Sequence, residues 1–294
     1  MKKGIHYWAL PVEMSLGEKF TFAKTCGFDG VELVVLKEGE CHVNATPREL
    51  SEIRKSADDA GIELLSLTNS LNWTCSFTSD SSAIRQKALD TLRRQIDIAH
   101  GLGVDSILAL PGFVSVAFPV NDLHPASDTS DKNAYHPSEE DIRYDKAYDR
   151  ALEGFSKATQ YAEKEKVTLC VENIWSNFLL SPLEMCTFID TIGSKRLKSY
   201  FDVGNACPYG IPHHWIEILG SRIGRVHVKD YQKGKLTLDA FVELGKGNID
   251  FSAVSESLKT IGYDGWITAE LNVDVSAPER VARETSSIMD NMFR

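Results

Sequence analysis

The feature that most constrains the fold is an alternation of eight short apolar runs with segments of helical period. Between the runs, apolar residues recur at spacings of three and four, as at Leu50, Ile53, Ala57 and Ala60, which is typical of amphipathic helices. Strands alternating with helices form parallel sheets covered by helices, and eight such units predict an α/β fold, a (βα)8 TIM barrel. The runs are residues 4–8, 30–35, 62–68, 106–110, 167–171, 198–203, 223–228 and 265–269.

Residues that begin and end helices agree with this division. Thr46 and Ser181 each precede a proline, and a glutamate follows two residues after that proline, a pattern typical of a capped helix start. Gly61 and Gly103 follow helical segments directly, where the left-handed residue that ends a helix is expected. An open doubly wound sheet is the alternative fold. No G-x-G-x-x-G motif follows the first run, which disfavours that alternative.

The length of 294 residues predicts a single barrel domain over residues 1–294, because such barrels need about 250 residues. No apolar run approaches the roughly 18 residues that span a bilayer. Six cysteines lie without a C-x-x-C pair, and the formal net charge is −10. We therefore expect a cytoplasmic protein with reduced cysteines, without a membrane or a nucleic acid as partner. The polar segment 113–137 is long for a loop, and we interpret it as a lid or insertion.

Four ionisable residues stand at the ends of four successive runs. Glu172, Asp202, His227 and Glu270 close or follow the fifth to eighth runs, and the carboxyl ends of barrel strands form the active-site face. Three carboxylates and an imidazole gathered there would repel one another unless a cation lay between them. One divalent metal ion would resolve this repulsion. Read singly, Asp202 also fits a helix cap, His227 a core histidine, and the glutamates ordinary strand-end charges.

The donor set narrows the choice of metal. One nitrogen and three oxygens suit Mn²⁺, Mg²⁺ or Co²⁺ better than a zinc site built on thiolates. We expect Mn²⁺ first, with Mg²⁺, Co²⁺ and Zn²⁺ as alternatives.

Several motifs resemble the sugar phosphate isomerase/epimerase family, a group of xylose isomerase-like barrels that includes ketose 3-epimerases and hydroxypyruvate isomerase. The motifs are V-E-N at 171–173, Y-F-D-V-G-N at 200–205, R-V-H-V-K-D at 225–230, A-E-L at 269–271, G-F-D-G-V-E-L at 27–33 and G-K-G-N-I-D-F at 245–251. The resemblance covers essentially the whole chain. It implies an isomerase or epimerase of a small sugar, sugar phosphate or polyol derivative.

The resemblance also implies roles for the four residues. Residues that match Glu172, Asp202, His227 and Glu270 bind the metal in that family, and the two glutamates act as acid and base on opposite faces of the substrate. A metal bound to adjacent carbonyl and hydroxyl oxygens would stabilise an enediolate after removal of the neighbouring proton. Asn205 replaces a histidine of the tagatose-type ketose 3-epimerases, and Phe178 replaces their second glutamate. These departures leave the identity of the substrate undetermined.

Other strand ends supply candidate substrate contacts. The predicted substrate-binding residues are His6, Trp8, Glu32, Asn69, Trp175, Asn205 and Lys233. Trp8 and Trp175, together with Trp73, would form an apolar wall, although packing alone also explains strand-end aromatics. Lys233 matches a substrate-binding arginine of the relatives, and a solvated turn is its alternative reading.

Three alternatives to the epimerase interpretation stay open. The same metal site would serve a lyase or dehydratase, because deprotonation beside a carbonyl also leads to elimination. An abasic-site endonuclease shares the barrel, but the histidines of its zinc cluster have no counterpart near Thr68 or Leu110. A non-catalytic sugar-binding barrel is the third alternative. The sequence does not fix the oligomeric state, and a homo-oligomer is among the expectations.

Overall fold

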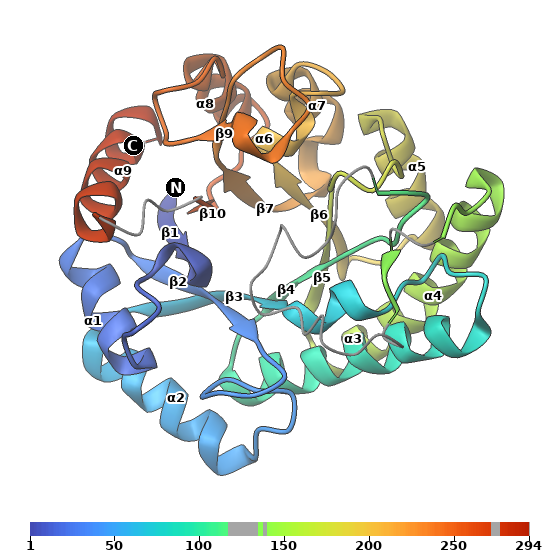
Figure 1. Cartoon of the computed structure of the whole chain (residues 1–294), viewed down its shortest axis with the longest axis horizontal. Helices are drawn as coiled ribbons and strands as arrows, with labels where there is room; N and C mark the ends of the chain where they lie inside the picture. Colours follow the sequence, from blue (N-terminus) through green and yellow to red (C-terminus); the bar gives the residue numbers. More distant parts are fainter. Residues whose placement is uncertain (117–134, 138–139, 272–276, 294) are drawn as a thin grey trace.

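The described residues of the computed structural model form a closed barrel of parallel strands (Figure 1). The structure describes residues 1–116, 135–137, 140–271 and 277–293. Around the barrel the strands follow the order β1-β10-β7-β6-β5-β4-β3-β2. Their bounds are β1 Lys2–His6, β2 Gly30–Val35, β3 Glu63–Asn69, β4 Ser106–Ala109, β5 Thr168–Glu172, β6 Leu197–Asp202, β7 Ile223–Val228 and β10 Trp266–Ala269. The closed ring confirms the predicted (βα)8 fold and excludes the open sheet.

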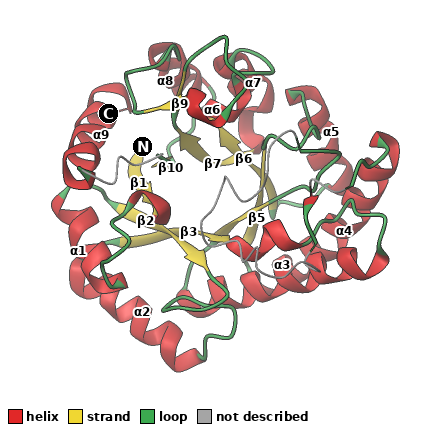
Figure 2. Ribbon diagram, in the orientation of Figure 1, coloured by secondary structure: helices red, strands yellow, loops and turns green. Residues whose placement is uncertain are grey.

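The helices surround this barrel as an outer layer (Figure 2). Buried apolar residues of these helices belong to the same core cluster as those of the strands, as expected for parallel strands that are buried on both sides. The longer helices are α1 Leu16–Thr25, α2 Pro47–Ala60, α3 Ser82–Leu102, α4 Tyr144–Glu165, α5 Pro182–Ile192, α7 Pro212–Leu219, α8 Phe251–Thr260 and α9 Pro278–Phe293. A short helix, α6 (Val203–Ala206), and the 3-10 helices η1 (Tyr7–Ala9) and η2 (Ser70–Thr74) lie at strand ends.

The predicted helix boundaries have the expected chemistry. The Thr46 side chain accepts a hydrogen bond from the backbone N–H of Glu49, and Glu49 bonds back to the backbone of Thr46. Gly61 and Gly103 end α2 and α3 with φ angles of 66° and 69°, a left-handed conformation that glycine adopts without steric cost. The first strand is shifted from its prediction, because the chain turns into η1 after His6.

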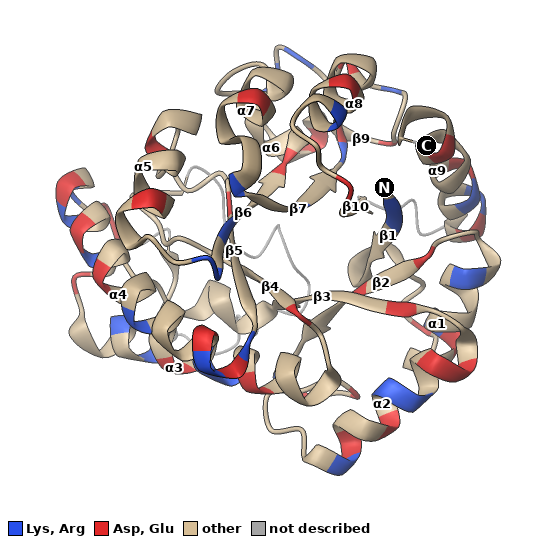
Figure 3. Ribbon diagram, turned by 180° about the vertical axis from the view of Figure 1, so that it is seen from behind, with Lys and Arg blue, Asp and Glu red and all other residues tan. Residues whose placement is uncertain are grey.

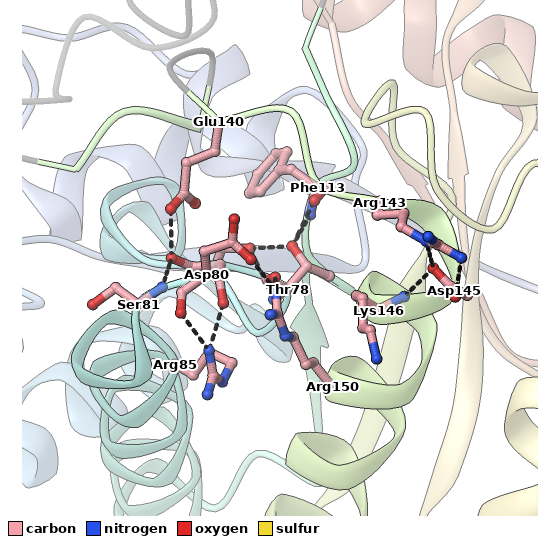
Figure 4. A network of polar contacts seen from close by, with 12 residues as sticks. Thr78, Asp80, Ser81, Arg85, Phe113, Glu140, Arg143, Asp145, Lys146 and Arg150 are labelled. Carbon is pink, nitrogen blue, oxygen red and sulfur yellow. Dashed lines mark hydrogen bonds and ion pairs between the residues drawn. The ribbon is translucent and has the colours of Figure 1, made fainter.

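A polar network fixes the loops that follow β3 and β4 (Figure 4). The hydroxyl of Thr78 donates to the carbonyl of Phe113 and accepts from the backbone N–H of Phe113 at 2.9 Å. Arg150 of α4 donates to the Thr78 carbonyl at 2.9 Å and to Asp80 at 2.7 Å. These bonds join the loops after β3 and β4 to α4. Most of the predicted lid, residues 117–134, lies outside the described residues.

The distribution of charged residues and the hydropathy of the helices bear on the partners expected for the chain. Lys and Arg are interspersed with Asp and Glu along the outer helices in Figure 3. Within the parts of the chain that the structure describes, no helix has both the length and the apolar character needed to cross a bilayer.

Candidate functional site

Four side chains from four neighbouring strands meet at the carboxyl end of the barrel. Glu172 and Asp202 are the last residues of β5 and β6, His227 lies near the end of β7, and Glu270 follows β10 directly. Asp202 pairs with His227 in the β6–β7 register, and the Glu270 N–H donates to the Val228 carbonyl at 3.1 Å. One ligand-type atom from each of the four side chains lies within 4.8 Å of the other three. The barrel thus assembles the predicted cluster.

The cluster fits a divalent cation. His227 Nδ1 lies 3.5 Å from carboxylate oxygens of Glu172 and Glu270 and 3.8 Å from Asp202 Oδ2. This nitrogen is buried, yet within the described residues it forms no hydrogen bond. Among the same residues, Asp202 Oδ2 accepts no hydrogen bond either, although the Lys229 ammonium nitrogen lies 3.0 Å from it. Buried polar atoms are normally satisfied. A buried imidazole nitrogen without a hydrogen bond, which faces three carboxylates, is the arrangement that a metal preferring nitrogen and oxygen ligands would bind.

Glu32 of β2 contacts the imidazole nitrogen of His227 that lies opposite to the cluster. Its Oε2 lies 2.6 Å from His227 Nε2, and its side chain is 0% exposed. Burial disfavours the imidazolium, but the carboxylates of Glu32 and Glu270 outweigh burial and raise the pKa of His227. This placement differs from the substrate contact expected of Glu32. On a strand buried on both faces the sequence pattern does not show which side chains point into the barrel.

Asn173 and Asn205 hold the acidic residues in place. Asn173 and Asp202 form two reciprocal bonds, from the Asn173 amide to the Asp202 carbonyl at 2.9 Å and from the Asp202 N–H to Asn173 Oδ1 at 2.8 Å. The backbone N–H of Asn205 donates to Asp202 Oδ1 at 2.7 Å, so Asp202 also caps α6. The Asn205 side chain donates to Glu172 Oε1 at 3.4 Å. Asn205 therefore contacts two members of the cluster.

Lys229 is a member of the site that the sequence reasoning missed. Its Nζ lies 2.5 Å from Glu270 Oε2 and 3.0 Å from Asp202 Oδ2, and its side chain is only 13% exposed. The Phe241 ring centroid lies 4.8 Å from the same nitrogen. The available signal was its place in the V-H-V-K-D motif, one residue past the end of β7 and two residues after His227. This spacing puts side chains on the same side of an extended chain.

The carboxyl groups of the cluster have different electrostatic surroundings. Burial raises the pKa of Glu172 to about 7. Burial also raises the pKa of Asp202, although Lys229 opposes the rise. Burial acts in the same sense on Glu270, but the charges of Lys229 and His227 outweigh it and hold the pKa of Glu270 well below its usual range. In the metal-free protein, Glu172 thus holds a proton at a higher pH than an ordinary glutamate does.

A cavity opens beside the two glutamates. Its lining includes His6, Trp8, Asn69, Trp73, Glu172 and Glu270. His6 is buried, and its Nδ1 accepts a hydrogen bond from the Trp8 N–H at 3.2 Å. Asn69 Oδ1 accepts from the Leu71 N–H, whereas its amide nitrogen is buried without a hydrogen-bond partner among the described residues. Asn69 therefore has a donor available beside the cavity.

Two predicted substrate contacts lie away from this cavity lining. Trp175 packs against Phe241, with ring centroids 4.9 Å apart, and its indole N–H donates to the Asn205 carbonyl. Lys233 is exposed and follows β8 (Asp230–Tyr231), which pairs with β9 (Phe241–Val242) in a small antiparallel ribbon that the sequence did not predict. Phe178, at the position of the relatives' second glutamate, is buried against Tyr144 and Tyr148.

Comparisons with known proteins agree with this architecture. A family model described as "Xylose isomerase-like TIM barrel" matches residues 20–292. The chain is 27% identical over 276 residues to a putative L-ribulose-5-phosphate 3-epimerase of Haemophilus influenzae, covering 92% of this chain and 88% of that protein. It is 24% identical over 274 residues to an L-ribulose-5-phosphate 3-epimerase of Escherichia coli K12, covering 89% and 84%.

Solved structures share the fold. A D-psicose 3-epimerase, crystallised in the presence of D-fructose, superposes with a TM-score of 0.77 at 20% identity and covers 99% of each chain. An L-ribulose 3-epimerase superposes with a TM-score of 0.77 at 18% identity, over 99% of this chain and 93% of that one. The names of these relatives agree with the enzyme class predicted from the sequence.

Proposed function

Since the chain belongs to the xylose isomerase-like TIM barrel family, we propose that it is a metal-dependent 3-epimerase of a ketose or ketose phosphate. The observation that carries this proposal is the convergence of Glu172, Asp202, His227 and Glu270 on one point at the catalytic end of the barrel. The names of the relatives direct the proposal to pentulose 5-phosphates such as L-ribulose 5-phosphate. The free ketoses of the structural neighbours form the second substrate group.

The four converging side chains would hold one divalent metal, with Mn²⁺ expected first. When bound, the metal would supply positive charge to the substrate oxygens on which negative charge develops. Glu32 would keep the proton of His227 on Nε2, so that Nδ1 offers its lone pair to the site. Asn173 and Asn205 would keep Asp202 oriented through the three hydrogen bonds already described.

The two glutamates would move the proton at C3. Both line the same cavity, and their strands are separated in the barrel order by β6 and β7. Epimerisation requires removal of a proton from one face and delivery to the other, so a base and a separately placed acid are needed. General acid–base groups of this kind typically contribute about 10²–10⁴-fold each.

The cavity lining would position the sugar. Asn69 would donate its available amide N–H to a substrate oxygen, and Trp8 and Trp73 would pack against the carbon chain. His6 would help to close the cavity wall beside His227. The centroids of these two imidazole rings lie 5.8 Å apart. Asn205, Trp175 and Lys233 stay proposed substrate contacts at longer range, on the side of the β8–β9 ribbon.

A product assay tests the proposal. Metal-loaded protein is incubated with L-ribulose 5-phosphate, L-ribulose, D-psicose and D-fructose in parallel, and the products are resolved by chromatography and NMR. The proposal predicts conversion of at least one ketose to its C3 epimer. A dehydrated product would instead identify a lyase, and an aldose would identify an aldose–ketose isomerase. The absence of any conversion in the panel would contradict the substrate class.

A further inference from the structure

Lys229 brings a fixed positive charge to two of the four proposed metal ligands. Its ammonium nitrogen lies 2.5 Å from Glu270 Oε2 and 3.0 Å from Asp202 Oδ2. These same two oxygen atoms face His227 Nδ1 at 3.5 Å and 3.8 Å. A cation bound among the four ligands would therefore share both oxygens with the ammonium group.

The position of this lysine is built into the fold. A Cβ added at Gly204 would stand 2.5 Å from Lys229 Cγ and 3.3 Å from the Phe241 ring, so the absence of a side chain at Gly204 makes room for the lysine stem. The ammonium lies 4.8 Å from the Phe241 ring centroid, within the range of a cation–π interaction. With an exposed fraction of 13%, it is poorly screened by solvent.

We propose that Lys229 is an internal cation that competes with the divalent metal for Asp202 and Glu270 and so lowers the metal affinity of the site. Two like charges that share the same oxygen partners repel each other, and the repulsion is strong where solvent does not screen it. In the metal-free protein the lysine compensates the two carboxylates. The proposal rests on the proposed metal site and adds a residue that sets its affinity.

In the alternative role, Lys229 only holds the ligands in position, and its removal would weaken metal binding. Most of the proposed metal ligands are held in place by groups other than the lysine. Asp202 is held by Asn173 and by the Asn205 N–H, and His227 is held by Glu32. The backbone of Glu270 is bonded to β7. Removal of the ammonium charge is therefore expected to favour the metal more than it disturbs the ligands.

The test is a comparison of Mn²⁺ affinity at fixed pH, by calorimetry on chelator-treated protein. Lys229→Met removes the charge in a side chain of similar length, and Lys229→Gln keeps an N–H donor to the carboxylates. The matched control is Lys55→Met, which removes the same charge from an exposed position on α2. We expect both Lys229 variants to bind Mn²⁺ at least about tenfold more tightly, because the repulsion between the ammonium charge and the metal is removed, and the control to match the parent.

The possible outcomes distinguish competition between Lys229 and the metal from failure of the proposed metal site. Unchanged affinity in both Lys229 variants overturns the competition, and weaker affinity in both assigns Lys229 to ligand support instead. If the parent binds no Mn²⁺, the proposed metal site itself fails, and this inference fails with it. Should Lys229→Met be unstable without metal, both variants are loaded during purification and the rate of Mn²⁺ release to a chelator is measured. Slower release than from the parent supports the competition, and equal or faster release contradicts it.

Discussion

Glu32 and His227, which are 195 positions apart in the chain, meet inside the barrel with 2.6 Å between Glu32 Oε2 and His227 Nε2. The carboxylate is fully buried, and a carboxylate at this distance favours a proton on Nε2. The other nitrogen, Nδ1, faces Glu172, Asp202 and Glu270. A carboxylate behind a metal-binding histidine raises its basicity and fixes its orientation.

Replacement of Glu32 by Gln should weaken metal binding while the fold is kept. The amide does not stabilise the protonated Nε2 as a carboxylate does, so Mn²⁺ affinity should fall by about 10–100-fold. Calorimetric titration measures the change, and circular dichroism checks the fold. Glu63→Gln, at an exposed position paired with Lys2, is the control and should bind Mn²⁺ like the parent. Equal Mn²⁺ affinities for the two variants would show that Glu32 does not contribute to metal binding.

Glu172→Gln and Glu270→Gln should each lower turnover by about 10²–10⁴-fold, because the amide retains an oxygen but does not transfer a proton. Steady-state kinetics on the converted ketose measures the loss. Solvent deuterium exchange at C3 shows whether one face of the substrate still exchanges when net epimerisation stops. A variant within about tenfold of the parent has lost only about 1.4 kcal/mol of transition-state stabilisation, and that glutamate would not be the proton carrier.

Asn173→Ala should destabilise the protein and misplace Asp202. The substitution removes both reciprocal bonds between Asn173 and Asp202, and an unsatisfied buried polar group costs about 1–3 kcal/mol. Urea unfolding of the metal-free protein should therefore show a lower free energy of unfolding, and Mn²⁺ affinity should fall as well. Asn44→Ala, at an exposed position, is the control. A variant with parental stability and affinity would show that Asn173 does not orient Asp202.

Metal affinity should fall as the pH is lowered. Burial raises the pKa of Glu172 to about 7, and the surrounding carboxylates raise the pKa of His227. Both groups therefore carry protons in the metal-free protein at acidic pH, and a metal binds only the deprotonated forms. Mn²⁺ titrations at about pH 6, 7 and 8 should show progressively tighter binding and proton release. An affinity independent of pH over this range would place the metal elsewhere.

The sequence predicted the barrel and the four converging residues because both follow from local patterns. Apolar runs, helical spacing and caps such as Thr46 define the elements, and a parallel barrel brings all strand ends to one face. The support of His227 by Glu32 was not predictable in this way. Val31, Glu32 and Leu33 are all buried in β2, so no alternation of polar and apolar residues marks the inward side.

Lys229 and the β8–β9 ribbon escaped prediction for a related reason. Their positions depend on contacts between segments distant in sequence, such as Lys229 with Glu270 and Tyr231 with Phe241. Lys233, in contrast, was selected because it matches a substrate-binding arginine of the relatives, and the structure leaves its side chain exposed beside the ribbon.

The most direct test of metal-dependent 3-epimerisation is NMR of L-ribulose 5-phosphate in D₂O with the metal-loaded protein and with the chelator-treated protein. The metal-loaded protein should form the C3 epimer with deuterium at C3, and the chelator-treated protein should form it only after Mn²⁺ is restored. The reaction is quenched with chelator before the spectra are recorded. Deuterium at another carbon, no exchange at C3, or equal exchange with and without metal would contradict the account.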